Sequence, residues 1–467
     1  MKKQFIIMMV IVSILVGSVQ IIAATQYTIT DLGTLGGTYS SASGINNWGQ
    51  VVGTSKIAGD SRYHAFLYSD GVMQDLGTLG GTNSFAYSIN NNGQVVGVSD
   101  ITGSMYHAFL YSGGTMQYLG TLGGREYSYG FGVNDSGQVV GYSGGIGYGK
   151  RAFLYSDGVI QDLGTLGNNE GSSAYAINNI GQVVGKSYIT DGSAHHAFLY
   201  SNGVMQDLGT LGGNFSWATG INDNSQVVGW AHITGDSAHH AFLYSDGVMQ
   251  DLGTLGGTYS WASGINNNCQ VVGWSQIAGD SDTHAFLYSS GEMQDLNTLS
   301  PSNSGWIIYD VLAINDFGQI VGRGINPEGY ERAFLLSPDP LPATQILTVR
   351  IEPNDLGIDT VDPNIGQHIF YQNSTANLDA TKFVDCPSVL HFDHWEGDVA
   401  EQNSAQTTVV MDTDKTVIAV FVDGAICGDE CHPNDLLGDF NHDCIIDFND
   451  FAAFAGNWLV CTKPECD

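Results

Sequence analysis

The sequence predicts an all-β protein whose largest part is a seven-bladed β-propeller. One repeat of about 44 residues recurs seven times between residues 25 and 337, and each copy contains four short extended segments separated by turns. The chain holds 62 glycines, while 43% of its residues are hydrophobic and only 13% are charged. Such a composition is typical of a turn-rich β protein and not of a disordered chain.

Three phrases define the repeat. Each occurs seven times, and the spacing between copies of the first is 43 to 45 residues. The first phrase, DLGTLGG or a near copy, begins at Asp31, Asp75, Tyr118, Asp162, Asp207, Asp251 and Asp295. The second, HAFLYS or a near copy, begins at His64, His107, Arg151, His196, His240, His284 and Arg332. The third is a turn phrase ending in QVVG, with its asparagine at Asn46, Asn90, Asn134, Asn178, Asn222, Asn266 and Asn315.

The first copy shows how the phrases become strands. We expect extended segments at 41–46, 50–53, 64–69 and 72–77. Asn-rich and Asp-Gly turns between apolar runs are strong hairpin signals, so the four segments predict two hairpins and a four-stranded antiparallel blade. A period of 40 to 50 residues is the size of one propeller blade.

The two ends of the repeat array predict how the ring closes. The array begins with a lone fourth strand at 27–33 and ends near Ser337 with a third strand that has no fourth. If the N-terminal strand completes the last blade, the ring has seven full blades and no exposed sheet edge. The alternative is an open β-solenoid, but the division of the last blade into three strands and one favours the ring.

The three phrases also support a resemblance. Residues 27–337 resemble the bacterial extracellular HAF-repeat family. The resemblance implies export and a repeat fold, and it implies no particular reaction.

Positions that differ between copies are candidates for function. The residue five before each turn asparagine should face the residue after each VVG across a hairpin, and most of these pairs match in chemistry. The pairs are Ser41/Thr54, Phe85/Val98, Tyr129/Tyr142, Ser173/Lys186, Trp217/Trp230, Trp261/Trp274 and Asp310/Arg323. Ser173 with Lys186 is the exception, and Asp310 with Arg323 is interpreted as a structural ion pair.

Two of these pairs form the candidate ligand site. Trp217, Trp230, Trp261 and Trp274 belong to adjacent blades near the end that carries the long loops. They could form an aromatic platform for sugar rings. The competing interpretation is packing between blades, because Trp217 has the same parity as the core residue Ile221.

No catalytic residues are predicted. The His or Arg that opens HAFLYS is interpreted as a structural hydrogen-bond donor, because a catalytic group is needed once and arginine is no zinc ligand. The Asp of DLG is interpreted as a turn or cap residue. No unrepeated carboxylate pair, Ser-His-Asp spacing or phosphate-binding glycine loop stands out.

The N-terminus and the overall charge indicate the compartment and exclude one class of partner. Residues 1–24 have the basic start, apolar run and small closing residues of a signal peptide, so we expect a secreted protein with no membrane span after its removal. The formal net charge of −33 argues against nucleic acid as a partner.

Two further modules are predicted after the propeller. Residues 338–344 are proline-rich and are expected to be a linker. Residues 345–423 show a new alternating pattern that resembles the InlB B-repeat-like modules of bacterial surface proteins, chiefly through Trp395, Gly397, Asp398 and the closing strand to Phe421. We expect a small β-domain for spacing or adhesion, with Trp395 in its core.

The tail, 424–467, carries a metal-binding pattern. Oxygen ligands stand at loop positions 1, 3, 5, 7, 9 and 12, which suits calcium, a hard cation with six to eight oxygen ligands. The expected ligands are Asp439, Asn441, Asp443, the carbonyl of Ile445, Asp447 and Asp450.

The tail also resembles type I dockerin repeats, which implies a cohesin-like protein as a candidate partner. It departs from them in having Cys444 at position 6, where glycine is usual, and a single evident loop. Five of the seven cysteines lie here, and in an exported protein disulfides are favoured over a zinc site, with the pairing open. Cys269 replaces a turn glycine and is expected to be free.

Together these features predict a secreted, non-catalytic binding or scaffold protein. The propeller would recognise carbohydrate, such as a polysaccharide or cell-surface glycan, or protein, and the calcium-dependent tail would anchor it. The alternatives are a carbohydrate-active enzyme (a glycoside hydrolase or lyase) of a polysaccharide-degrading system and a structural surface or adhesion protein.

Overall fold

The computed structural model describes residues 26–101, 105–145, 148–167, 171–189, 192, 194–301, 304–341, 344–352, 366–380 and 390–423. The predicted signal peptide and calcium-binding tail lie outside these residues. Within the described ranges, no helix has the length and apolar character needed to cross a membrane.

Seven four-stranded antiparallel sheets form the blades of the propeller, as predicted. Blade 1 contains β2 (Gly36–Ile45), β3 (Val51–Ile57), β4 (Tyr63–Ser69) and β5 (Val72–Asp75). Blade 2 contains β6 (Ser84–Ile89), β7 (Val95–Asp100), β8 (Tyr106–Ser112) and β9 (Thr115–Tyr118). Blade 3 contains β10 (Tyr127–Val133), β11 (Val139–Gly145), β12 (Tyr148–Ser156) and β13 (Val159–Asp162), and is preceded by the short helix η1 (Leu122–Gly124).

The remaining blades follow the same order. Blade 4 contains β14 (Ser172–Ile177), β15 (Val183–Tyr188), β16 (His195–Ser201) and β17 (Val204–Asp207). Blade 5 contains β18 (Gly212–Ile221), β19 (Val227–Ile233), β20 (His239–Ser245) and β21 (Val248–Asp251). Blade 6 contains β22 (Gly256–Ile265), β23 (Val271–Ile277), β24 (Thr283–Ser289) and β25 (Glu292–Asp295), and the one-turn helix α1 (Leu296–Leu299) follows it. Blade 7 contains β26 (Ile307–Ile314), β27 (Ile320–Ile325), β28 (Glu331–Asp339) and β1 (Gln26–Asp31).

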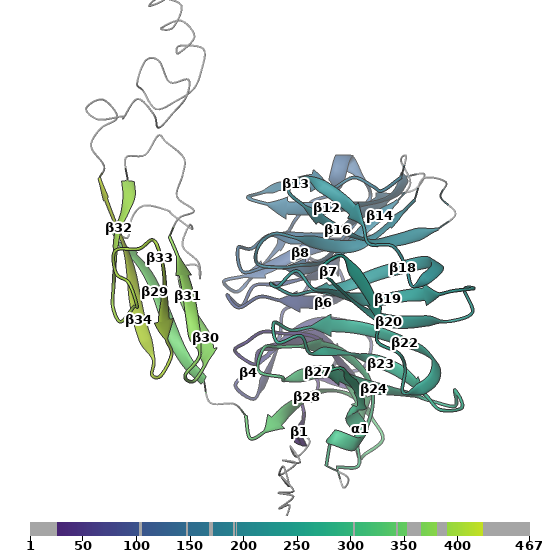
Figure 1. Cartoon of the computed structure of the whole chain (residues 1–467). Helices are drawn as coiled ribbons and strands as arrows, with labels where there is room; N and C mark the ends of the chain where they lie inside the picture. The colour runs from purple at the N-terminus through teal and green to yellow at the C-terminus, as the bar shows by residue number, and fades with distance from the viewer. Residues whose placement is uncertain are drawn as a thin grey trace, which may run out of the picture.

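The N-terminal strand closes the last blade, which confirms the predicted 3+1 division. β1 pairs antiparallel with β28, from Gln26 opposite Asp339 to Asp31 opposite Phe334. In Figure 1 the purple N-terminal strand lies beside the green β28. The buried Tyr27, with 2% of its surface exposed, joins the core of this blade with Phe334. The two ends of the repeat array are therefore held together by one sheet.

A closed ring of asparagine hydrogen bonds links the seven blades around the axis. In each blade the side-chain amide of the turn asparagine donates to the backbone carbonyl of the same asparagine in the next blade, at 2.8–3.2 Å. The last bond runs from Asn315 of blade 7 to Asn46 of blade 1. The asparagine side-chain oxygen also accepts from the backbone of its own turn, so these buried side chains are satisfied as donors and acceptors.

A second ring lies one residue further along each turn. Here each backbone N–H donates to the side-chain oxygen of the next blade at 2.8–3.0 Å. Its members are Asn47, Asn91, Asp135, Asn179, Asp223, Asn267 and Asp316. Together the two rings line a polar cavity of about 170 Å³ at the turn-bearing mouth of the central channel.

The VVG phrase is explained by a close backbone approach. At the glycine of every copy, an added Cβ would lie 1.8–2.1 Å from a carbonyl oxygen of the innermost strand, that of the residue just before the one that the glycine faces. The phenylalanine of HAFLYS packs beside the same glycine, and in all seven blades it is fully buried. Any side chain at this position would separate two strands of the blade, so only glycine fits.

A second set of strands forms the β-domain expected at 345–423. It contains β29 (Thr344–Glu352), β30 (Gly366–Tyr371), β31 (Thr375–Asp379), β32 (Leu390–Glu396), β33 (Gln406–Val410) and β34 (Lys415–Asp423). One sheet has the order β30-β29-β34-β32, with β29 and β34 parallel, and β31 pairs with β33. Because β28 extends to Asp339, only residues 340–343 of the expected linker lie between strands.

The Trp-Glu-Gly-Asp corner builds the core of this domain. Trp395 is fully buried with Leu347, Val417 and Met411, so the prediction that it is a core residue is confirmed. Gly397 adopts φ +110°, a conformation that side chains disfavour, and an added Cβ would lie 2.6 Å from the Thr416 carbonyl. Asp398 then forms an ion pair with Lys415 at the start of β34.

Candidate binding site in the central channel

Each innermost strand carries a one-residue β-bulge in the same place. In blade 5, for example, Trp217 faces Trp230 and Ala218 faces Gly229, but the register then shifts so that Gly220 faces Val228. A bulge leaves one residue unpaired and re-aims its side chain. The bulged residues, which all line the central cavity, are Ser43, Tyr87, Phe131, Tyr175, Thr219, Ser263 and Leu312.

The bulges surround a cavity of about 610 Å³ in the centre of the propeller. Five consecutive blades each contribute one aromatic ring to its wall. Blades 2, 3 and 4 contribute the bulged residues Tyr87, Phe131 and Tyr175, whereas blades 5 and 6 contribute Trp217 and Trp261. In those last two blades the bulged residue is the small Thr219 or Ser263, which leaves room for the indole rings. Blades 7 and 1 present Leu312 and Ser43, so the aromatic wall is an arc and not a full circle.

The four predicted tryptophans are in contact across blades 5 and 6. Both cross-strand pairs form as predicted, with ring centroids 6.1 Å apart for Trp217–Trp230 and 6.3 Å apart for Trp261–Trp274. Trp261 also contacts Trp217 at 5.5 Å and Trp230 at 5.2 Å. All four are partly exposed. Only Trp217 and Trp261 line the cavity, while Trp230 and Trp274 stand behind them on the second strands.

Further ring contacts extend the tryptophan cluster into an aromatic belt over blades 1 to 6. Successive ring centroids lie 4.8–6.3 Å apart, a range typical of interacting aromatic pairs. The belt runs through Tyr39, Tyr63, Phe85, Tyr106, Tyr129, Phe131, Tyr175, Trp217, Trp261 and Trp274. The comparison of pairs between copies identified its tryptophans but missed the bulged residues. The column three before each turn asparagine, which varies between Ser, Tyr, Phe, Thr and Leu, carried that signal.

Two basic side chains lie against the tryptophan cluster of blades 5 and 6. The Lys186 ammonium lies 3.7 Å from the centroid of the Trp217 ring, a cation–π contact. Burial, together with the charge of Lys150, lowers the pKa of Lys186 to about 8. His239 packs between Trp230, at 5.1 Å, and Tyr259, at 4.7 Å. Burial lowers the pKa of His239 to about 4, so its imidazole is neutral at pH 7.

Blade 7 interrupts the belt with an ion-pair network. Arg323 Nε lies 2.9 Å from Asp310, and its Nη1 lies 3.2 Å from Glu331, so one guanidinium joins both carboxylates. Tyr309 also donates a 2.6 Å hydrogen bond to Glu331. The predicted Asp310–Arg323 pair is therefore confirmed. Burial raises the pKa of Asp310 above its ordinary value even with the arginine beside it.

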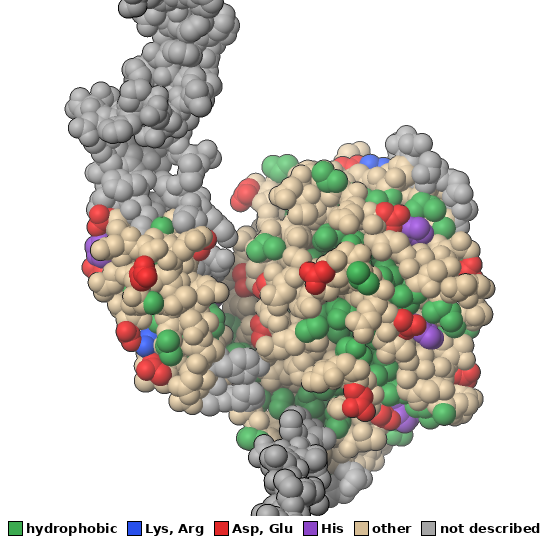
Figure 2. Space-filling view, viewed as in Figure 1, with side chains coloured by type: hydrophobic (Ala, Val, Ile, Leu, Met, Phe, Trp, Pro, Cys, Tyr) green, Lys and Arg blue, Asp and Glu red, His purple; other side chains and the backbone are tan. Residues whose placement is uncertain are grey.

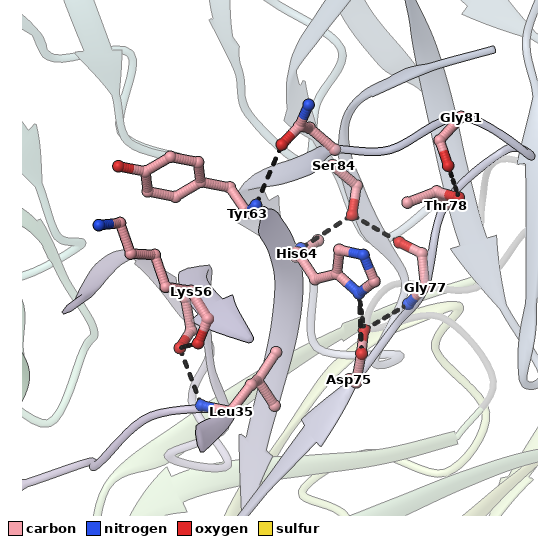
Figure 3. Close-up of polar contacts among 12 residues, drawn as sticks. Leu35, Lys56, Tyr63, His64, Asp75, Gly77, Thr78, Gly81 and Ser84 are labelled. Carbon is pink, nitrogen blue, oxygen red and sulfur yellow. Dashed lines mark hydrogen bonds and ion pairs between the residues drawn. The ribbon is translucent and has the colours of Figure 1, made fainter. Parts of the chain in front are cut away.

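Four of the five repeated histidines pair with the Asp of DLG, as structural donors would, and His107 of blade 2 is the exception. In blade 1 the Nδ1 atom of His64 lies 2.8 Å from Asp75, and the same carboxylate accepts a 2.8 Å bond from the Gly77 N–H (Figure 3). The same His–Asp pair forms in blades 4, 5 and 6, and Figure 2 shows histidines lying beside acidic side chains along one side of the propeller. In blade 3, Arg151 donates to Asp162 instead. Blade 7 departs, because Arg332 bonds to the Thr38 carbonyl.

A serine near these pairs joins neighbouring blades. The Ser84 hydroxyl of blade 2 accepts from the Ala65 N–H of blade 1 at 2.9 Å and donates to the Gly77 carbonyl (Figure 3). Equivalent serines bond to the preceding blade at five more blade boundaries. The HAFLYS and DLG phrases therefore hold the scaffold around the channel.

The predicted calcium ligands, Asp439, Asn441, Asp443, Ile445, Asp447 and Asp450, fall outside the described residues. Among the residues that the structure does describe, no group of three or more His, Cys, Asp or Glu could hold a metal ion. In the same part of the chain Cys269 is free, as expected from its place in a turn, where it adopts φ +60°.

Comparison with known proteins gives similarity of fold alone. No protein-family description matches the sequence, and no curated protein matches it. Among solved structures, the β-propeller domain of the Trilobed protease from Pyrococcus furiosus is 10% identical, with a TM-score of 0.43 over 64% of this chain and 95% of that one. TolB from Acinetobacter baumannii is 12% identical, with a TM-score of 0.36 over 62% of this chain and 63% of TolB. A gluconolactonase from Xanthomonas campestris is 9% identical, with a TM-score of 0.35 over 68% and 91% of the two chains.

Proposed function

We propose that this protein is an extracellular, non-catalytic recognition protein whose propeller binds carbohydrate in the central cavity. The observation that carries the proposal is the arc of five aromatic rings on five consecutive blades around one cavity. Faces of sugar rings are apolar C–H surfaces edged by hydroxyls, so they pack on aromatic rings. The cavity of about 610 Å³ also lies within the 300–1,000 Å³ that is usual for small-molecule sites.

The cavity wall offers the mixed chemistry that such a ligand needs. Tyr87 and Tyr175 bring phenol hydroxyls, and burial raises the pKa of both, which keeps them neutral. Ser43 of blade 1 and Ser263 of blade 6 add hydroxyl groups to the same wall. A ligand could therefore stack on the aromatic arc and still form hydrogen bonds with the wall.

The test is binding to a polysaccharide array, followed by calorimetry with the best oligosaccharide. Trp217→Ala and Trp261→Ala should weaken binding about tenfold or more, since loss of a stacked aromatic ring costs on the order of 1–2 kcal/mol. Trp274→Ala is the matched control, because this tryptophan belongs to the same cluster but does not line the cavity. The affinity of the Trp274→Ala variant should stay within about twofold of that of the original protein.

Two results would contradict the proposal. If the Trp217→Ala, Trp261→Ala and Trp274→Ala variants bind as tightly as the original protein and only their melting temperatures change, the tryptophans serve only to pack the blades. Release of soluble sugar products from a bound polysaccharide would favour the carbohydrate-active enzyme. The enzyme is the less favoured alternative because Asp310, the prominent unrepeated carboxylate, forms an ion pair with Arg323 at 2.9 Å.

For the tail we propose calcium-dependent anchoring. Asp439, Asn441, Asp443, Ile445, Asp447 and Asp450 would supply oxygen ligands at the spacing that wraps around one calcium ion. Calcium should raise the melting temperature of the tail in the full chain, and Asp439→Ala with Asp450→Ala should abolish that rise. An unchanged calcium response in the double variant would overturn this assignment.

A further inference from the structure

A second cavity lies on blades 2 and 3, apart from the central one. Its volume is about 340 Å³, and none of its lining residues lines the central cavity. Four of the six are tyrosines, and the others are a methionine and a lysine. This tyrosine pocket is formed by Met105, Tyr106, Tyr127, Tyr129, Tyr142 and Lys150.

The tyrosine pocket exists because blade 3 lacks a side chain at one position. Gly144 occupies the place held by Lys56, Asp100, Tyr188, His232, Gln276 and Ile325 in the other blades. The Tyr127 ring lies in the vacated space, since an added Cβ on Gly144 would be 2.5 Å from the Tyr127 Oη and 2.7 Å from its ring. The tyrosine ring therefore forms a wall where other blades have a side chain of the second strand.

The pocket carries one positive charge. Lys150 is exposed, and its ammonium lies 4.4 Å from the centroid of the Tyr142 ring. The nearby Asp100 does not line the pocket, and its carboxylate accepts hydrogen bonds from Thr82 and Asn83 at 2.6–2.8 Å. A ligand in the pocket would thus meet aromatic faces, phenol hydroxyls and a single ammonium group.

We propose that the tyrosine pocket binds one carboxylated sugar residue, a uronic acid, within an otherwise neutral glycan. The tyrosine faces receive the sugar ring and the Lys150 ammonium pairs with its carboxylate. A single uronate fits better than a polyuronate, because the pocket has one cation while the whole chain has a net charge of −33 and repels polyanions. This inference rests on the proposed carbohydrate recognition and names a substrate class for it.

The experiment compares three tetrasaccharides by calorimetry with the full-length protein at pH 7 and low salt. The probes are a xylo-oligosaccharide carrying one 4-O-methylglucuronic acid, the same compound with its carboxyl group reduced, and xylotetraose. We expect the acidic probe to bind about tenfold more tightly than the other two, because that is the affinity that one charge-assisted hydrogen bond contributes. The preference should fall steeply as salt is raised, because Lys150 is exposed.

Lys150→Gln should remove the preference, and Lys150→Arg should retain most of it. Lys56→Gln is the matched control, since this lysine also lies over a tyrosine ring, 5.7 Å from the Tyr63 centroid, but lies outside the pocket. Both positions are at least partly exposed, so the variants should fold. Equal affinity for acidic and neutral probes, or a preference that survives Lys150→Gln, would overturn the inference. If the probes still bind and Trp217→Ala abolishes that binding, the proposed carbohydrate recognition stands without the uronate inference. Absence of any glycan binding overturns both proposals.

Discussion

The side-chain amide of Asn315 donates a 3.0 Å hydrogen bond to the backbone carbonyl of Asn46, a residue 269 positions earlier in the chain. This bond completes the asparagine ring, because the other six bonds run from one blade to the next in sequence order. The propeller is thus closed at the axis, by Asn315 and by Asp316 of the second ring, and in the outer strand by β1.

We predict that Asn315→Asp destabilises the protein by about 2 kcal/mol. Aspartate keeps the oxygen that accepts from the turn backbone but loses the donor, and it places a charge against the Asn46 carbonyl. Asn134→Asp, between blades 3 and 4, is the matched variant and should cost about the same, since both are links of one closed ring. Chemical denaturation measures both. A cost below about 0.5 kcal/mol at Asn315 with a full cost at Asn134 would contradict closure at the axis.

Blade 2 lacks the His–Asp pair of its neighbours, and this predicts a stabilising substitution. Tyr118 replaces the DLG aspartate there, so His107 Nδ1 is buried without a hydrogen-bond partner. Tyr118→Asp should restore an acceptor both for His107 and for the Gly120 N–H, and stabilise the protein by about 1 kcal/mol. The reciprocal Asp207→Tyr, which removes both bonds in blade 4, should destabilise it by a similar amount. Denaturation midpoints test the pair, and a loss of stability in Tyr118→Asp would show that the tyrosine ring contact matters more.

Much of this scaffold could be predicted from the sequence because the repeats constrain one another. All seven cross-strand pairs form as expected, from Ser41 with Thr54 to Asp310 with Arg323. The agreement has a compensating cause. A hairpin without a bulge that pairs Trp217 with Trp230 would place Asn222 opposite Ser225, whereas the Asn222 N–H donates to the Gln226 carbonyl and Ile221 faces Val227. That extra turn residue shifts the register by one, and the bulge at Thr219 shifts it back before Trp217.

The bulges also explain why the sequence predicted the tryptophans of the site but not its bulged residues. A bulge has no signature in the alternation along a single strand, because small and large residues alike can occupy it, as Ser43 and Phe131 do. The inward direction of Tyr87, Phe131 and Tyr175 therefore could not be inferred from alternation alone. The tyrosine pocket depends on Gly144, a residue whose absence of a side chain matters only because the Tyr127 ring fills its place.

The close strand approach at the VVG glycines predicts a large local cost. Gly141→Ala would place a Cβ 1.8 Å from the Tyr129 carbonyl, so the strands of blade 3 must separate and stability should fall by about 3 kcal/mol or more. Gly149→Ala in the same blade is the control, because its nearest neighbour would be 4.0 Å away. Thermal and chemical unfolding of both variants tests the prediction. A Gly141→Ala protein as stable as Gly149→Ala would mean that the blade tolerates a wider spacing.

The burial of His239 between Trp230 and Tyr259 should make stability depend on pH. Burial first, and then the charges of His232 and His240, lower its pKa from 6.5 to about 4 in the folded protein. Between these pH values the unfolded chain binds a proton at His239 that the folded protein does not. The stability that depends on a neutral His239 is therefore complete above pH 6.5 and is lost as the pH falls toward 4. His239→Phe keeps a ring between Trp230 and Tyr259 but cannot be protonated. The melting temperature of this variant should therefore drop less than that of the original protein between pH 7.5 and 4.5, while effects of the many carboxylates are common to both. An equal fall in the melting temperatures of the two proteins across that range would contradict the prediction. It would show that His239 takes up its proton in the folded protein as readily as in the unfolded chain, and that water reaches the ring.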